Sequence, residues 1–150
     1  MLFIVFKLRD DRYALDTSCV VEVVSLVDLK PLPNAAAGIS GIFDYRGTPV
    51  PVIDLSVLAS GRAAVARLST RIIIVNYLDE RDEAHVVGLI AEGATETMRR
   101  EDGDFVTFGL GAGTAPFLGP VTRGTSGLIQ RIDVRALLSV PIRALLLEAV

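Results

Sequence analysis

The eighteen residues from Gly41 to Leu58 read GIFDYRGTPVPVIDLSVL, and this stretch decides the fold class. An apolar run that starts at Ile42 stops at the Arg-Gly-Thr-Pro segment 46–49. Glycine tolerates a positive φ there and proline removes a backbone donor, so a turn is predicted. An extended apolar pattern then leads to Asp54, whose carboxylate is placed to cap a following helix. The stretch therefore predicts a strand, a tight turn, a second strand and a short helix.

The same order of features returns near the C-terminus. The Arg-Gly-Thr triplet of residues 46–48 occurs again at residues 123–125, and apolar residues and an aspartate follow each copy, Asp54 or Asp133. An internal duplication explains this quasi-repeat, which we place at about residues 117–138. The alternative is coincidence, because Arg-Gly turns before apolar strands are common in β proteins.

Composition limits the class of protein. A chain of 150 residues with 51% hydrophobic residues can bury a sizeable core, and no apolar run reaches the roughly 20 residues that span a bilayer. Cys19 and His85 are each the only residue of their type, which excludes an intramolecular disulfide and a zinc site of the usual composition. A net charge of −3 gives no basic face for a phosphate backbone. We therefore expect a cytoplasmic protein with no nucleic-acid partner and no direct membrane insertion.

Residue patterns along the chain predict a mainly β fold. About ten short strands and two or three small helices favour small barrels or a sandwich over alternating β/α units. The strongest strand prediction is residues 71–78, with residues 85–91 as its antiparallel partner and Gly88 as a bulge or point of close approach. Residues 19–24 fit either a strand or a short helix, and Pro141 can start a C-terminal helix. Further strands are predicted at residues 2–8, 13–15, 104–108, 117–122 and 128–132.

Residues suited to catalysis are sparse. His85 opens a predicted strand without a nucleophile or paired carboxylate nearby, so a strand-edge residue is favoured over a general base. Cys19 lies among valines, where a thiol is usually an unreactive small hydrophobe. Asp54 and Asp133 are the best candidate pair of carboxylates, although helix capping explains both. We expect no catalytic residue, no cofactor and no metal. The alternatives left open are a small β-barrel ligand-binding protein and an enzyme that uses Asp54 and Asp133.

Several short motifs follow one another in a specific order. They include Phe-Lys-Leu at residues 6–8, Tyr-Ala-Leu-Asp at 13–16, Val-Val-Glu-Val at 20–23, Leu-Pro-Asn-Ala at 32–35 and the central stretch at 41–55. By these motifs nearly the whole chain resembles the CheW-like family of chemotaxis coupling proteins. The central stretch is similar to the family's Gly-Val-Ile-Asn-Leu-Arg-Gly and Val-Pro-Val-Ile-Asp-Leu signature. The order and spacing of the pieces carry the resemblance, since no single piece is diagnostic.

This resemblance implies a fold and a function. The implied fold is two small five-stranded, SH3-like β-barrels packed together within one domain over residues 1–150, with a few short helices and a C-terminal helix. The implied function is a non-catalytic adaptor that couples the cytoplasmic tips of chemoreceptors to the regulatory domain of a histidine autokinase. Such proteins build rings or arrays, so recruitment to membrane-associated receptor arrays is expected.

The resemblance also points to individual residues. Arg46 stands at the family's signature arginine and Glu22 at its Val-x-Glu glutamate, and both are tied to partner contacts in the family. The chain departs from the family where Asp44 and Tyr45 replace the usual Asn-Leu before the arginine. We expect Asp44 either to pair with Arg46 or to select a receptor of different charge. The predicted partner-binding residues are Arg46, Glu22, Val20, Asp44 and Tyr45.

Overall fold

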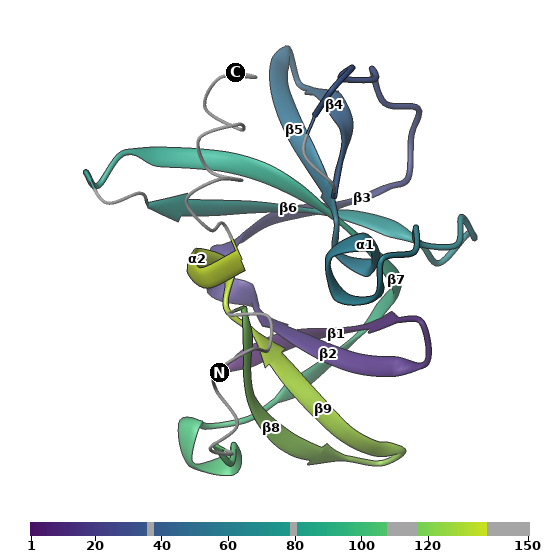
Figure 1. Ribbon diagram of the computed structural model, residues 1–150. Coiled ribbons are helices and arrows are strands. Elements are labelled where there is room, and N and C mark those ends of the chain that lie inside the picture. The colour runs from purple at the N-terminus through teal and green to yellow at the C-terminus, as the bar shows by residue number, and fades with distance from the viewer. Residues whose placement is uncertain (36–37, 79–80, 108–116, 138–150) are drawn as a thin grey trace.

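A computed structural model describes residues 1–35, 38–78, 81–107 and 117–137, and the fold there is mainly β as predicted (Figure 1). The predicted C-terminal helix from Pro141 and the glycine-rich sequence 109–113 lie outside the described residues. No helix in these four ranges is long and apolar enough to cross a membrane. The elements are β1 (Leu2–Leu8), β2 (Asp11–Asp16), η1 (Thr17–Cys19), β3 (Val20–Ser25), β4 (Ile39–Tyr45), β5 (Thr48–Asp54), α1 (Leu55–Ser60), β6 (Arg71–Leu78), β7 (Ala84–Arg99), η2 (Asp102–Asp104), β8 (Leu118–Gly124), β9 (Gly127–Ile132) and α2 (Val134–Leu137).

The strands form two sets of five that share β7. The upper set in Figure 1 has the order β3-β6-β7-β5-β4, and the lower set has the order β7-β1-β2-β9-β8. Each set contains one parallel pair, β5 with β7 in the upper set and β2 with β9 in the lower set. An isolated bridge links the ends of each set, from Lys30 to Ile42 in the upper set and from Val106 to Val121 in the lower set. Neither set is therefore closed by a continuous ladder of hydrogen bonds.

Strand β7 is longer than the sequence indicated. The predicted partner of residues 71–78 ended at Ala91, whereas β7 runs for 16 residues, first beside β6 and then beside β1. Gly93 lies inside this strand with φ +58°, a conformation that glycine adopts without strain. Gly88 is a point of close approach and not a bulge, since it stays in register with Ile74. A Cβ atom at Gly88 would lie 2.9 Å from the Cγ2 atom of Ile72.

The structure decides one open prediction, for residues 19–24, and contradicts another, for residues 104–108. Residues 19–24, which fitted either a strand or a helix, form the end of the 3-10 turn η1 followed by strand β3. The predicted strand 104–108 is not a strand over its described part, where η2 and one bridge at Val106 stand instead. A capping box competes with an extended ladder there, because the Glu101 N–H donates to Asp104 Oδ2 at 2.7 Å.

Apolar side chains form three clusters that fill the molecule. The largest lies between the two strand sets, and smaller clusters occupy the inside of each set. Because successive residues of a strand face opposite sides, one strand supplies two clusters. In β6, for example, Ile73 and Val75 face the shared cluster while Ile72 and Ile74 face the interior of the upper set. Residues 72 to 75 therefore have no exposed surface.

Candidate functional site

The turn between β4 and β5 presents Arg46 at its tip. Tyr45 and Thr48 are paired across the hairpin, so Arg46 and Gly47 form a two-residue turn. Their φ values of +52° and +84° match a type I′ turn, which suits the twist of a tight hairpin. The carboxylate of Asp44 accepts a hydrogen bond from the Gly47 N–H at 2.9 Å. The Asp44 side chain therefore stabilises the turn. This is its role in the structure, at a position where the family usually has Asn.

Glu22 of β3 reaches the same turn. Arg46 Nη2 donates to Glu22 Oε2 at 3.0 Å, and the hydroxyl of Tyr45 donates to the same carboxylate oxygen. The guanidinium carbon of Arg46 also lies 5.2 Å from the centre of the Tyr45 ring, within cation–π range. We call these three side chains the hairpin cluster. The structure thus brings together three of the five predicted partner-binding residues, which come from segments more than twenty positions apart.

The hairpin cluster is fixed on its inner side and open on its outer side. Tyr45 is half-buried and packs against the interior cluster of the upper set, with its ring centre 6.0 Å from that of Phe43. The side chain of Arg46 is 74% exposed, and that of Glu22 is 37% exposed. An arginine held at one end and exposed along most of its length is suited to contact a second protein.

The hydrogen bond to the Glu22 carboxylate is the main cause of a raised pKa of the Tyr45 phenol. Burial adds to this effect, and the positive charge of Arg46 opposes it. A phenol already titrates near pH 10, so a further rise keeps Tyr45 neutral at physiological pH. Tyr45 consequently keeps the hydroxyl proton that it donates to Glu22 at physiological pH.

Valines flank Glu22 along strand β3. Val20, a predicted site residue, is half-buried and packs against the cluster shared by the two strand sets. Val21 and Val23 are instead exposed by 45% and 36%. Sequence reasoning missed these two valines, although the alternation along β3 would have placed them on the face opposite to Val24. Strand β3 ends the strand order of the upper set, and its Glu22 side chain reaches the hairpin.

The residues considered for catalysis have structural roles. Asp54 Oδ1 accepts from the Ser56 N–H at 2.9 Å, and Asp133 Oδ1 accepts from the Arg135 N–H at 3.0 Å, so each caps its own helix as predicted. His85 stacks on Tyr77 with ring centres 5.1 Å apart. Among the described residues no three His, Cys, Asp or Glu side chains are grouped to hold a metal ion.

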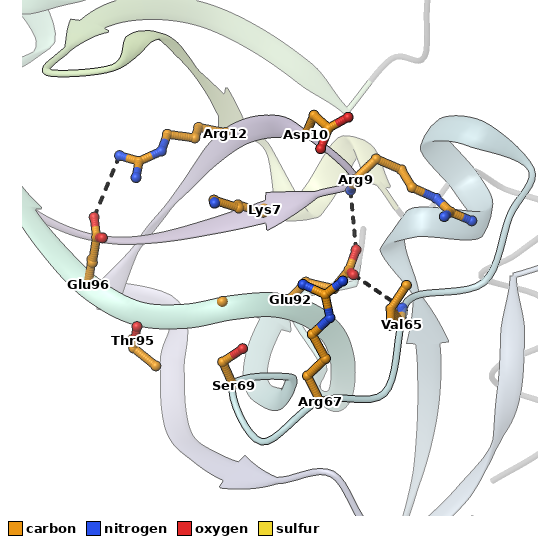
Figure 2. Close-up of a pocket in the computed structure, with 11 residues that line it drawn as sticks. Lys7, Arg9, Asp10, Arg12, Val65, Arg67, Ser69, Glu92, Thr95 and Glu96 are labelled. Atoms are coloured by element: carbon orange, nitrogen blue, oxygen red, sulfur yellow. Dashed lines mark hydrogen bonds and ion pairs between the residues drawn. The ribbon is translucent and has the colours of Figure 1, made fainter.

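A polar cleft of about 430 Å³ lies where β7 passes from one strand set to the other (Figure 2). Glu92 forms its wall and is nine-tenths buried. Its two carboxylate oxygens accept from the N–H groups of Arg9 and Val65, each at 3.2 Å. Glu92 thereby ties the β1–β2 turn to the segment between α1 and β6. The cleft is lined mainly by charged and polar side chains, so it differs from the enclosed apolar cavity that a ligand-binding barrel requires.

The arrangement of two strand sets around a shared β7 is also seen in known proteins. The family model of the CheW-like domain matches residues 2–141. The chain belongs to the CheW-like domain family. A solved structure, the scaffolding protein TtCheW of Thermoanaerobacter tengcongensis, superposes with a TM-score of 0.81 over 94% of this chain and 89% of that one, at 26% identity. The predicted family and fold class are thus confirmed.

Two curated relatives give the same result in sequence. The chemotaxis protein CheW of Treponema pallidum is 28% identical over 145 residues, which is 91% of this chain and 81% of that protein. The chemotaxis protein CheW of Rhizobium meliloti is 25% identical over 101 residues, which is 67% of this chain. The aligned part spans 62% of the length of the Rhizobium meliloti protein. These CheW-like relatives are named for chemotaxis.

Proposed function

We propose that this CheW-like chain is a non-catalytic adaptor that couples the cytoplasmic tip of a chemoreceptor to the regulatory domain of a chemotaxis-type histidine autokinase. Family membership and the likeness to a scaffolding protein support this proposal. The observation that carries it is the hairpin cluster, in which a turn with two positive φ values presents a largely exposed Arg46. Such a side chain on a rigid support is typical of protein interfaces.

The same proposal accounts for the rest of the described molecule. Apolar clusters fill both strand sets, and Asp54 and Asp133 are each engaged by their own helix. These features favour a binding module over an enzyme or a carrier of an apolar ligand. We further propose one domain over residues 1–150 with two β-barrel subdomains, the second quasi-repeat lying at about 117–138. The protein would act in the cytoplasm, within a ring or array of receptors.

Each predicted site residue has a proposed part in partner binding. Arg46 makes the direct contact with the partner, and Glu22 and Tyr45 hold the Arg46 side chain in place. Asp44 stabilises the turn through its hydrogen bond to Gly47. Val20 anchors the start of β3 in the core.

A binding experiment with purified components tests the proposed function. The receptor tip and the kinase regulatory domain of the same organism are each titrated against the wild-type chain, Arg46→Ala and Arg46→Glu. Loss of a hot-spot arginine costs on the order of 2 kcal/mol or more, so we expect binding of at least one partner to weaken by roughly 30-fold. Circular dichroism confirms that each variant is folded.

Arg67→Ala provides the matched control. Arg67 is another exposed arginine, but it lines the polar cleft and not the hairpin cluster. Its removal should leave both affinities within about twofold, because exposed charges away from an interface contribute little. If the wild-type chain bound neither partner, the proposed function would be wrong. If both Arg46 variants bound like wild type, the assignment of the site would be wrong.

A further inference from the structure

Tyr45 touches both charged members of the hairpin cluster, each through a different part of its side chain. Its hydroxyl donates to the carboxylate of Glu22, and the face of its ring lies against the guanidinium of Arg46. Aliphatic side chains of similar size have neither a donor nor a π face. Position 45 therefore determines whether the ion pair between Glu22 and Arg46 has a third partner.

The ion pair alone would hold Arg46 loosely. Its described charge contact is one Nη2–Oε2 pair at 3.0 Å, and the arginine side chain is 74% exposed. Exposed pairs of this kind contribute little because solvent screens them and two long side chains must be ordered. The ring contact of Tyr45 limits the positions of the guanidinium, and its hydroxyl fixes the carboxylate that the guanidinium binds.

We propose that Tyr45 is a positioning residue that holds the Arg46 guanidinium in its partner-binding orientation before a partner arrives. This inference rests on the proposed function, because it assigns Arg46 to partner contact. An interface that orders a mobile arginine loses rotamer entropy on binding, and a side chain that is ordered beforehand loses less. Tyr45 thus raises affinity without itself having to touch the partner.

The same geometry specifies the chemistry that the partner must present. Glu22 Oε2 is already occupied by two donors, the Tyr45 hydroxyl and Arg46 Nη2. The guanidinium has five N–H donors and no acceptor, so several of its donors remain for a second protein. Arg46 therefore suits a surface of hydrogen-bond acceptors, namely carboxylates or exposed backbone carbonyl groups.

The test separates orientation from binding by measuring each. Tyr45→Phe removes the hydroxyl and keeps the ring, whereas Tyr45→Leu removes both. Nitrogen-15 relaxation of the Arg46 Nε–H reports side-chain order in the protein alone, and titration with the partner that Arg46→Ala weakens reports affinity. We expect Arg46 to become more mobile in both variants. Affinity should fall roughly three- to tenfold for Tyr45→Phe and further for Tyr45→Leu.

Tyr13→Phe is the matched control. Tyr13 belongs to β2 in the other strand set and is largely buried, so the same chemical change occurs far from the hairpin cluster. It should alter neither the order of Arg46 nor the affinity. Unchanged order of Arg46 in both Tyr45 variants would reject the positioning role whatever the binding result. Equal or tighter binding by Tyr45→Leu, which lacks both the ring and the hydroxyl, would reject it as well.

These outcomes differ from a failure of the proposed function. If the wild-type chain bound neither receptor tip nor kinase domain while Arg46 still lost order in Tyr45→Phe, the coupling function would be rejected and the orientation of Arg46 by Tyr45 would stand. If Arg46→Ala weakened binding while neither Tyr45 variant did, the function would stand and the positioning role would be rejected.

Discussion

Cys19 shows at the scale of one residue how local packing sets reactivity. Its thiol donates to the backbone carbonyl of Asp16 at 3.1 Å at the end of η1. Burial, reinforced by the charge of Asp16, raises the pKa of the Cys19 thiol from 9.0 to about 11. Only the thiolate is a good nucleophile, so the folded protein holds Cys19 in its unreactive form at neutral pH.

We therefore predict that iodoacetamide alkylates Cys19 slowly in the folded protein at pH 8 and fast when the protein is unfolded in concentrated urea. Mass spectrometry measures both rates. The folded state keeps the thiol proton to higher pH than the unfolded chain does. The protonated thiol therefore adds to the free energy of unfolding below about pH 9, and this contribution is lost as the pH rises through about 11. Cys19→Ala should make the alkaline loss of stability less steep. Equal alkylation rates in buffer and in urea would contradict the prediction.

The contact between Glu22 and Arg46 marks a limit of sequence reasoning at this scale. The resemblance singled out both residues, but their contact depends on a strand order that brings β3 close to the β4–β5 turn. The expected pairing of Asp44 with Arg46 followed from their closeness in sequence. In the structure the Asp44 carboxylate accepts a hydrogen bond from the Gly47 N–H, as short acidic side chains in turns commonly do.

The two helix caps allow a comparison at the scale of the element. Helix α1 has six residues, which provide too few internal hydrogen bonds for stability alone, and α2 is described over Val134–Leu137. Asp54 is 5% exposed and accepts from Ser56 N–H and also from Ala64 N–H at 3.0 Å. Asp133 is exposed, and among the described residues its carboxylate accepts only from N–H groups of α2. The buried cap thus serves two segments and the exposed cap serves one.

We predict unequal losses of stability when these caps are removed. Asp133→Ala should lower the free energy of unfolding by about 1 kcal/mol, which is typical of a lost N-cap. Asp54→Ala should cost about 2–4 kcal/mol, since it also leaves the Ala64 N–H without its acceptor. The loss for Asp54→Asn should lie between the losses for Asp133→Ala and Asp54→Ala, because asparagine keeps one acceptor oxygen. Urea denaturation measures all three, and equal losses for both alanine variants would contradict this ranking.

Strand β7 explains why elements were easier to predict than their lengths. Alternating and apolar runs located most strands, and Asp54 and Asp133 located both helix starts. Gly93 interrupts the apolar pattern, and a glycine inside a strand normally weakens it, so nothing in the sequence indicates that the strand predicted to end at Ala91 continues. The positive φ of Gly93 instead lets one strand pass from the upper to the lower set. Only the pairing with β1 and β6 shows this continuity.

At the scale of the whole molecule, the shared apolar cluster determines how the two strand sets unfold. Its members come from both sets, among them Phe6 of β1, Leu15 of β2, Ile53 of β5 and Ile73 of β6. Leu89 of β7 also belongs to it, and β7 contributes hydrogen bonds to both sets. Separating the sets would expose the largest core of the molecule, so the two subdomains should not be stable apart.

This coupling predicts that a destabilising substitution in one strand set also lowers the stability of the other set. Ile129 is 3% exposed and lies in the interior cluster of the lower set, far in sequence from β6. Ile129→Ala should lower the free energy of unfolding by about 2–5 kcal/mol. If the molecule unfolds as one unit, the slowest-exchanging amide protons of β6 in the upper set should lose the same amount of protection. Native-state hydrogen exchange measures this at each amide.

The adjacent residue supplies the control for this experiment. Leu128 is 61% exposed, so Leu128→Ala should change stability by no more than about 0.5 kcal/mol and leave hydrogen exchange in β6 unchanged. If Ile129→Ala left β6 fully protected, the two strand sets would unfold separately and the single-domain proposal would be wrong. An equal loss in both sets would instead mean that a partner stabilising the β4–β5 hairpin also stabilises the distant lower set, since binding to the folded state adds stability to the whole cooperative unit.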